Sequence, residues 1–487
     1  MPSRTIVIKK GVRATGTEFN MRGFAFAVPL LLAPGVSMAS GLPGAELSLL
    51  WALPFAGILL SIALCPLLVA GFWHHHFGKV SAFWALAFLL PALLVYGHEV
   101  AGSVLMHALV AEFLPFIILV FALYVISGGI LIRGNLSGTP ALNTGLLAIG
   151  TVLASLMGTT GAAMLMIRPV LRANDQRRYN VHVVVFFIFL VANIGGGLTP
   201  IGDPPLFLGF LKGVSFGWTI SHMAAPVAFA ALVLLAVFYL LDSHFYRKED
   251  FSRPDPTPDT PLGIAGRLNF LWLALVVGAV VLSGIWQSGV HFTLPGGVEL
   301  PLEGVVRDGL MLLAAGLSLW LTPKACREAN DFDWGPILEV AKLFAGIFVV
   351  MAPALAILRA GPDGALASLV ALVSTPDGTP VNGMYFWLTG ALSSFLDNAP
   401  TYLVFFNLAH GDAAHLMEAM PATLTAISAG AVFMGANSYI GNAPNFMVKA
   451  IAEGQGVKMP SFFGYMLWSG AILLPLFALM TWVFFAG

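Results

Sequence analysis

Two aspartates, Asp203 and Asp397, stand inside strongly apolar stretches of the 487-residue sequence. An ionisable side chain within a membrane-spanning segment is costly, and is therefore a functional candidate by default. Burial favours the uncharged form of a carboxyl group, so such an aspartate can hold a proton near neutral pH and exchange it for a cation. Each aspartate also has a structural interpretation as the cap of the helix that follows it. The two roles can coexist.

Small polar residues accompany the aspartates in four segments that interrupt apolar sequence. The whole set comprises Thr159, Thr160, Asn193, Thr199 and Asp203 in the first half, and Asp397, Asn398, Asn437, Ser438, Asn442 and Asn445 in the second. Hard cations such as Na⁺ prefer the oxygen ligands that these side chains and the interrupted backbone offer. We therefore expect the set to line an ion- or substrate-binding site. Asp397, Asn398 and Asn437 are the candidate Na⁺ ligands.

The four interruptions form two pairs at a constant offset of 239 residues. The residues Gly196, Ile201, Gly202, Pro205 and Phe207 recur as Gly435, Ile440, Gly441, Pro444 and Phe446. The same offset pairs residues 153–161 with residues 392–400. Secondary transporters are built from such repeats, and their substrate and ion sites lie where helices are broken near the membrane midplane.

Composition indicates a polytopic membrane protein. Hydrophobic residues make up 58% and charged residues 10% of the chain, and the mean hydropathy is +0.88, whereas soluble domains carry about 25% charged residues. The net charge of −1 and the lack of a basic block argue against nucleic acid as a partner. Neither Cys65 and Cys326 nor any nucleophile–base pattern indicates a metal centre or catalysis. We expect no enzyme and no cofactor other than a transported or coupling Na⁺.

Apolar segments of about 20 residues predict the membrane spans. They are 47–70, 80–97, 104–127, 181–211, 221–242, 268–286, 308–322, 336–358, 421–450 and 461–485. The spans 181–211 and 421–450 contain breaks. Two further apolar segments, 141–168 and 383–410, carry polar residues at their middle and are predicted to be re-entrant hairpins. The fold prediction is thus an all-α polytopic membrane protein with about ten transmembrane helices, two re-entrant hairpins and two broken helices.

The distribution of cations predicts that the two repeats have opposite orientation. Cytoplasmic loops are rich in Lys and Arg, and segment 141–168 has arginines on both sides, which places both its ends inside. Segment 383–410 is followed by no Lys or Arg until Lys449, which places its ends outside. The loops predicted outside hold little beyond Lys212, Arg307 and Arg359. This is the pattern of inverted-topology repeats.

Four regions follow from these boundaries. Residues 1–45 are an N-terminal extension with a signal peptide cleaved near Ala39, because an apolar stretch over 24–36 precedes small residues; an uncleaved first helix is the alternative. Residues 46–243 form repeat 1 and residues 267–487 form repeat 2. Residues 244–266, which are polar and rich in proline, are a cytoplasmic linker.

The sequences Thr199-Pro200-Ile201-Gly202-Asp203 and Asp397-Asn398-Ala399-Pro400 resemble motifs of the ion transporter superfamily, above all its NhaD-type sodium/proton antiporters. The layout over residues 46–487 is also similar to a bacterial group labelled citrate transporters or sodium/proton antiporters (CitMHS-like). The resemblance implies a homodimer in which a moving part carries both hairpins past a scaffold. One departure disfavours dicarboxylate transport: those carriers have Ser-Asn-Thr in each repeat, whereas the matching tips here read Gly158-Thr159-Thr160 and Asp397-Asn398-Ala399. The lack of Arg and Lys at the four interruptions also argues against a carboxylate substrate.

Two functions remain open at this point. The first is a sodium/proton antiporter of the bacterial inner membrane, in which Asp203 and Asp397 alternately bind H⁺ and Na⁺. The alternative is a Na⁺- or H⁺-coupled symporter for citrate or another small carboxylate, with Asp397 and Asn398 holding the coupling ion and Thr159, Thr160 and Thr199 contacting the anion. A membrane-embedded enzyme or assembly factor is disfavoured, because neither needs paired breaks.

Overall fold

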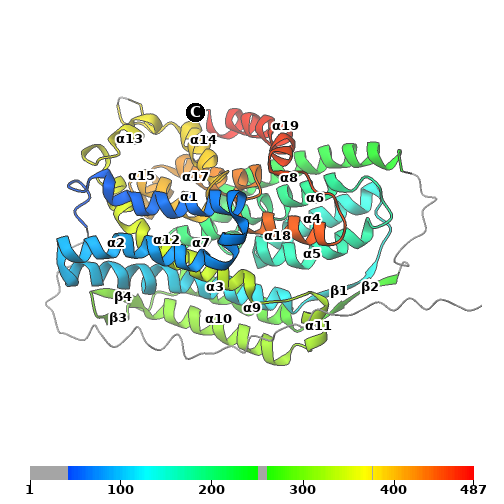
Figure 1. Ribbon diagram of the computed structural model, residues 1–487, viewed down its shortest axis with the longest axis horizontal. Helices are drawn as coiled ribbons and strands as arrows, with labels where there is room; N and C mark the ends of the chain where they lie inside the picture. The colour runs from blue at the N-terminus through cyan, green and yellow to red at the C-terminus, as the bar shows by residue number, and fades with distance from the viewer. Residues whose placement is uncertain (1–41, 250–259, 376, 487) are drawn as a thin grey trace, which may run out of the picture. The chain divides into compact units, whose positions relative to one another are not determined.

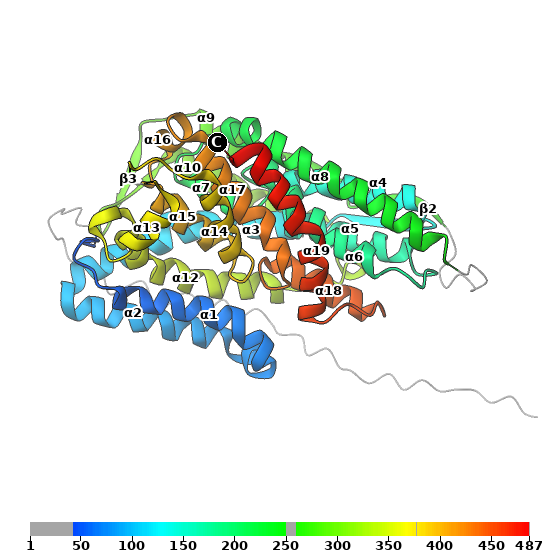
Figure 2. The same cartoon turned by 90° about the horizontal axis from the view of Figure 1, so that it is seen from above.

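The computed structural model describes residues 42–249, 260–375 and 377–486. The predicted cleavage site at Ala39 and the proline-rich part of the linker, residues 254–258, lie outside the described residues. The described chain is a bundle of helices, shown in two views in Figures 1 and 2. Its helical character confirms the predicted all-α polytopic class.

The helices before the first hairpin differ in one respect from the prediction. The elements are η2 (Leu49–Ala52), α1 (Leu53–Leu68), α2 (Ala70–Met106), the π-helical η3 (His107–Phe113) and α3 (Leu114–Gly128). Helix α2 begins ten residues before the predicted span 80–97. A single residue, Val69, separates it from α1. It is interrupted at Gly97, where φ is +80° and the backbone is not helical. Only glycine adopts such a conformation readily.

The rest of the first half contains the first hairpin and the first broken helix. These elements are α4 (Pro140–Met157), α5 (Thr159–Ala173), α6 (Val181–Leu190), η4 (Ile194–Leu198), α7 (Pro204–Leu211) and α8 (Phe216–Tyr246). Proline occupies the first position of both α4 and α7, where its missing N–H costs no hydrogen bond. Pro204 therefore restarts a helix directly after the break, and Pro140 starts the first arm of the hairpin.

The second half repeats this order of elements. It contains α9 (Asn269–Ile285), α10 (Leu302–Leu321), α11 (Lys324–Ala329), α12 (Gly335–Arg359), η5 (Gly361–Asp363), α13 (Ala367–Val373), α14 (Asn382–Ser393), α15 (Asn398–Leu408), α16 (Ala413–Glu418), α17 (Pro421–Met434), η6 (Gly435–Asn437), α18 (Ala443–Gly454), α19 (Phe462–Met480) and η7 (Thr481–Phe485). Helices α14 and α15 form the second hairpin, and α17, η6 and α18 form the second broken helix.

Two short β-ribbons, which the sequence analysis did not predict, lie between helices. Strand β1 (Leu131–Asn135) pairs antiparallel with β2 (Thr260–Ala265), and β3 (His291–Leu294) pairs with β4 (Val298–Pro301). The predicted linker 244–266 is consequently not irregular throughout. Helix α8 extends into the start of the linker, as far as Tyr246. At the other end of the linker, β2 pairs with β1 in the loop before the first hairpin.

Eight helical segments within the described residues are long and apolar enough to cross a membrane. They are Leu49–Leu68, Ala70–Gly128, Pro140–Met157, Val181–Leu198, Phe216–Tyr246, Leu302–Leu321, Gly335–Arg359 and Phe462–Phe485. The 59-residue segment Ala70–Gly128 joins the predicted spans 80–97 and 104–127 into one. The predicted span 268–286 appears as the shorter apolar helix Asn269–Ile285. Helix α4, predicted as a re-entrant arm, is itself of spanning length.

Burial separates a central group of helices from a peripheral one. In α6, α15 and α17 nearly every residue is buried, whereas α2, α10 and the C-terminal helix expose large apolar side chains. Leu94 is 85%, Trp320 79% and Trp482 75% exposed. Apolar surfaces of this kind suit lipid as the solvent. The central helices carry the interruptions, so the polar breaks are kept away from lipid.

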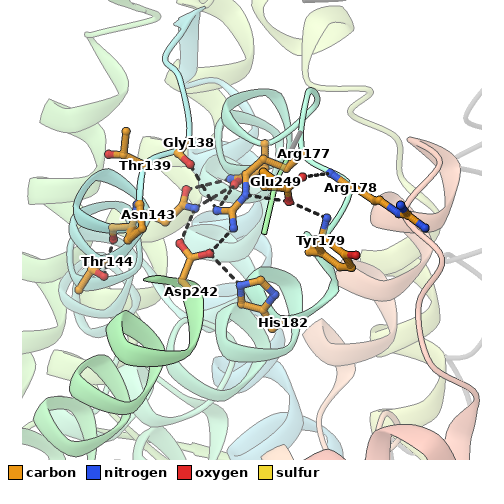
Figure 3. A network of polar contacts seen from close by, with 12 residues as sticks. Gly138, Thr139, Asn143, Thr144, Arg177, Arg178, Tyr179, His182, Asp242 and Glu249 are labelled. Carbon is orange, nitrogen blue, oxygen red and sulfur yellow. Dashed lines mark hydrogen bonds and ion pairs between the residues drawn. The ribbon is translucent and has the colours of Figure 1, made fainter. Parts of the chain in front are cut away.

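A buried polar network fixes one end of the first hairpin (Figure 3). Asp242 of α8 is fully buried, and its Oδ1 lies 2.6 Å from Arg177 Nη2 and 2.8 Å from His182 Nε2. Asn143 of α4 donates to Asp242 Oδ2 at 3.0 Å and to Asn174 at 2.8 Å. The network therefore joins the start of α4, the residue after α5, the start of α6 and the end of α8.

We expect Asp242→Ala to destabilise the protein by about 3–5 kcal/mol, because it leaves the buried Arg177 guanidinium without its nearest carboxylate. The measurement is the unfolding temperature of the purified protein in detergent, followed by intrinsic fluorescence. The matched control is Asp363→Asn, which changes an exposed aspartate. Equal unfolding temperatures for the two variants would contradict the assignment of Asp242 as an anchor.

Candidate functional site

Each hairpin tip contacts the broken helix of its own repeat through equivalent hydrogen bonds. Thr199 Oγ1 donates to the Ser155 carbonyl at 2.5 Å, and Ser438 Oγ donates to the Ser394 carbonyl at 2.5 Å. In the reverse direction Ser155 Oγ donates to Gly195 O at 2.5 Å, and Ser394 Oγ to Met434 O at 3.1 Å. Both pairs of bonds are related by the offset of 239 residues. The sequence repeat is therefore also a repeat of tertiary contacts.

The sequence analysis missed Ser155 and Ser394, although they lie inside the paired segments 153–161 and 392–400. The two serines are identical residues at the repeat offset, and this match is the sequence signal from which they could have been predicted. Each serine uses both its hydroxyl and its backbone carbonyl to hold the broken helix. They are positioning residues.

Two glycines in each break allow the backbone to cross itself closely. A Cβ atom on Gly202 would lie 2.3 Å from Gly196 O, and a Cβ atom on Gly441 would lie 2.6 Å from Gly435 O. Both distances are far shorter than a carbon–oxygen contact permits, so no larger residue fits. The identical glycines found at the repeat offset are explained by this crossing.

Asp203 lies at the place where the two repeats meet. Its side chain is 1% exposed, and Thr159 Oγ1 donates to its Oδ1 at 2.8 Å. Two amides of the second repeat also reach it: Asn398 Nδ2 donates to Oδ2, and Asn442 Nδ2 lies 3.5 Å from Oδ1. Within the described residues Asp203 has no ion pair with Lys or Arg. Its carboxyl group is therefore surrounded by neutral donors.

The capping interpretation is correct for one aspartate and wrong for the other. Asp397 Oδ1 accepts a hydrogen bond from Ala399 N at 3.0 Å at the start of α15. Asp203 occupies the equivalent position before α7, but its side chain makes no capping hydrogen bond there. Its carboxylate is instead directed towards the donors Thr159, Asn398 and Asn442. These donors come from neighbouring elements, so the local sequence does not reveal them.

A chain of amides crosses between the two broken helices. Asn193 Nδ2 donates to Asn445 Oδ1 at 2.7 Å, and Asn442 Nδ2 lies 3.3 Å from Asn193 Oδ1. Asn442 also donates to Ala192 O at 3.0 Å, while Asn445 donates to Gly435 O at 2.8 Å and to Ser438 O at 2.9 Å. These side chains satisfy carbonyls that the breaks leave without a helical partner. The side-chain oxygens of Asn193 and Asn445 are already occupied by amide donors.

Two amide oxygens at the site are left over. The side-chain oxygens of Asn398 and Asn437 are buried and have no hydrogen-bond partner among the described residues. Asn398 uses its amide nitrogen for Asp203, and Asn437 uses its own for Ser394 Oγ at 2.9 Å. A buried acceptor without a partner is costly, so each one requires an explanation such as a bound ion or water. Both belong to the predicted Na⁺ ligands.

A cavity of about 40 Å³ lies beside the first hairpin tip. Thr159 and Thr160, together with the break residues up to Asp203, form its polar side, and apolar residues of α3 such as Leu119 and Leu123 form the other. A water molecule needs at least about 10–15 Å³ by this measure. The cavity is large enough for a water or a small dehydrated cation, and in this conformation it is too small for a tricarboxylate.

Paired interrupted helices around a buried carboxyl group, inside a bundle of membrane-spanning helices, define the class of protein: a multi-pass membrane transporter. Residues 44–485 match the model of the family described as "Putative citrate transport", and the chain belongs to that family. The resemblance to the citrate transporter-like group is thereby confirmed. The chain is also similar to uncharacterized transporters of Mycobacterium bovis and Mycobacterium tuberculosis. Each is 23% identical over 327 residues, which cover 66% of this chain and 72% of the relative.

We expect Gly202→Ala and Gly441→Ala each to destabilise the protein by about 1–3 kcal/mol, because the added methyl group would overlap a backbone carbonyl. The measurement is again the unfolding temperature in detergent. Gly145→Ala in α4 is the control, since no atom lies within 4 Å of its added Cβ. If Gly202→Ala behaves like Gly145→Ala, the close crossing at the break is not as described.

Proposed function

We propose that this transporter exchanges Na⁺ for H⁺ at Asp203, with Asp397 as the second carboxylate of the site. The observation that supports this most strongly is the complete burial of Asp203 among neutral donors. A buried carboxylate without a cationic side chain is too costly to persist alone. A proton or a metal cation from solution can neutralise it, and the two compete for the same oxygens. Competition of this kind is the basis of exchange.

The ligand set that we propose for Na⁺ combines one charged and several neutral oxygens. Asn398 supplies a buried oxygen without a hydrogen bond and lies directly after Asp397, and Asn437 supplies another. Hard cations favour such carboxylate and carbonyl oxygens. Thr159 and Asn442 orient Asp203 by donating hydrogen bonds to it. The remaining polar residues form hydrogen bonds with backbone groups at the breaks. Thr160 lines the cavity beside Asp203.

We expect Asp203→Asn and Asp397→Asn each to abolish Na⁺-driven proton movement while leaving the protein folded. Asparagine keeps the size and shape of the side chain at position 203, and a flip of the Asn398 amide gives the new NH2 group an acceptor in place of a donor. At position 397 asparagine caps a helix as well as aspartate does, so the main loss in each variant is the negative charge. The assay uses proteoliposomes that contain a pH-sensitive dye and carry a pH gradient, to which NaCl, KCl or citrate is added. Wild type should collapse the gradient on addition of NaCl.

The control for this experiment is Asp363→Asn at an exposed position. It should exchange like wild type. Exchange that persists in Asp203→Asn would contradict the proposal, and exchange that persists in Asp397→Asn would remove Asp397 from the site.

We expect Asn398→Ala and Asn437→Ala to raise the half-saturating Na⁺ concentration by about tenfold or more, since each loses an oxygen ligand. Proton affinity of the site should change less, because neither side chain titrates. The same liposome assay, run over a range of Na⁺ concentrations, measures this. Gln455→Ala, at an exposed amide, is the control. An unchanged Na⁺ dependence in both variants would exclude these oxygens as ligands.

A second function is favoured by the family description, which names citrate. In that case Asp397 and Asn398 hold the coupling cation, and Thr159, Thr160 and Thr199 contact the anion in a more open conformation. The liposome assay separates the two functions: proton or sodium movement that appears only when citrate is present indicates symport. We also infer a homodimer in a bacterial inner membrane, which follows from the resemblance and is tested by the mass of the purified protein in detergent.

A further inference from the structure

A second, larger cavity of about 440 Å³ lies at the C-terminal end of α12. Its lining shares no residue with the ion site described above. Val104, Ala108, Phe348 and Leu355 contribute apolar walls, and Arg359 ends the helix at its rim. Cavities of about 300–1,000 Å³ with apolar walls and a few polar groups are typical of small-molecule sites.

The two charged residues that line this cavity, Glu112 and Arg359, differ in their partners. Glu112 forms an ion pair with Lys212 at the end of α7. Arg359 donates from Nε to Asn407 Oδ1 at 2.6 Å, and this partner is neutral. No ion pair of Arg359 occurs within the described residues. Because Lys212, which is not part of the lining, neutralises Glu112, Arg359 is the charged lining residue that has no ion pair among the described residues. The two terminal nitrogens of its guanidinium suit the oxygens of a carboxylate or phosphate.

The backbone beside the cavity is unusual. Residues His107–Phe113 form a π-helix, in which each hydrogen bond joins residues five apart. Such segments occur frequently at functional sites. Here the π-helix turns His107, Ala108 and Glu112 towards the cavity, and His107 Nε2 lies 4.0 Å from Glu112 Oε1. This geometry is independent of the charge at Arg359.

We propose that this cavity binds an organic anion with a single carboxylate or phosphate head, held by Arg359, and an apolar body that packs on Val104, Phe348 and Leu355. A polyanion such as citrate does not fit the apolar walls, because its further carboxylates would be left without partners. An organic cation does not fit either, since Lys212 already neutralises Glu112. A free organic acid and the head of a membrane lipid share the required chemistry. Binding here does not depend on the proposed ion exchange.

The test measures saturable binding of radiolabelled 4-phenylbutyrate to the purified full-length protein in an uncharged detergent, with no ion gradient. Arg359→Gln should weaken binding by about tenfold or more, because it removes the charged donor. Ala352→Phe should also weaken binding, because it fills the cavity and leaves Arg359 in place. The matched control is Arg267→Gln, which changes an exposed arginine whose Nε also donates to a neutral oxygen, at 3.0 Å.

Wild-type protein alone provides a second test that does not require any variant to fold. The amine and the alcohol analogous to 4-phenylbutyrate should compete poorly with it, and equal competition by either would overturn the proposal. So would unchanged binding in Arg359→Gln. Displacement by dihexanoyl-phosphatidylglycerol but not by dihexanoyl-phosphatidylcholine would identify a lipid head as the occupant; displacement by neither would leave the free acid, and both results support an anion site.

Discussion

The structure depends on one constraint: backbone groups released by a broken helix cannot be satisfied by the bilayer. Each break in this protein is repaired by side chains from elements beside it. Thr199 and Ser438 hold the carbonyls of Ser155 and Ser394, while Asn442 and Asn445 hold carbonyls within the breaks. The hairpins must therefore lie against the breaks, and the same hydrogen bonds that repair the backbone assemble the polar site.

The two repeats use this scheme with different chemistry. Asp203 in the first repeat is equivalent by offset to Asn442 in the second, and Thr159 is equivalent to Asn398. All four side chains converge, but only one of them is charged. Asp397 is equivalent to Gly158, a glycine with φ of +78°. Each repeat thus contributes one carboxyl group at a position where the other repeat has a neutral residue, so the symmetry of the fold does not extend to its charges.

The two cavities also differ in the charges that they present. The carboxyl group of Asp203 meets neutral donors in a cavity that suits a small cation, whereas the larger cavity at the end of α12 carries a guanidinium that has no ion pair among the described residues. Arg359 and Lys212 contact α15 and η3 respectively, so the rim of the larger cavity touches a hairpin arm and the first broken helix. An anion bound there would lie against elements that also shape the ion site.

The sequence by itself determined the class of fold, and it predicted the polar residues that the structure brings together at the candidate site. Hydropathy shows the membrane spans because lipid selects apolar side chains, and the repeat of glycine, proline and small polar residues shows the breaks because few residues tolerate them. The roles of those residues were decided only by the tertiary structure. Asp203 and Asp397 look alike as residues that precede a helix, yet one caps it and the other reaches Asn398 and Asn442. Those partners lie 195 and 239 residues away, and local patterns carry no information about contacts across the two repeats.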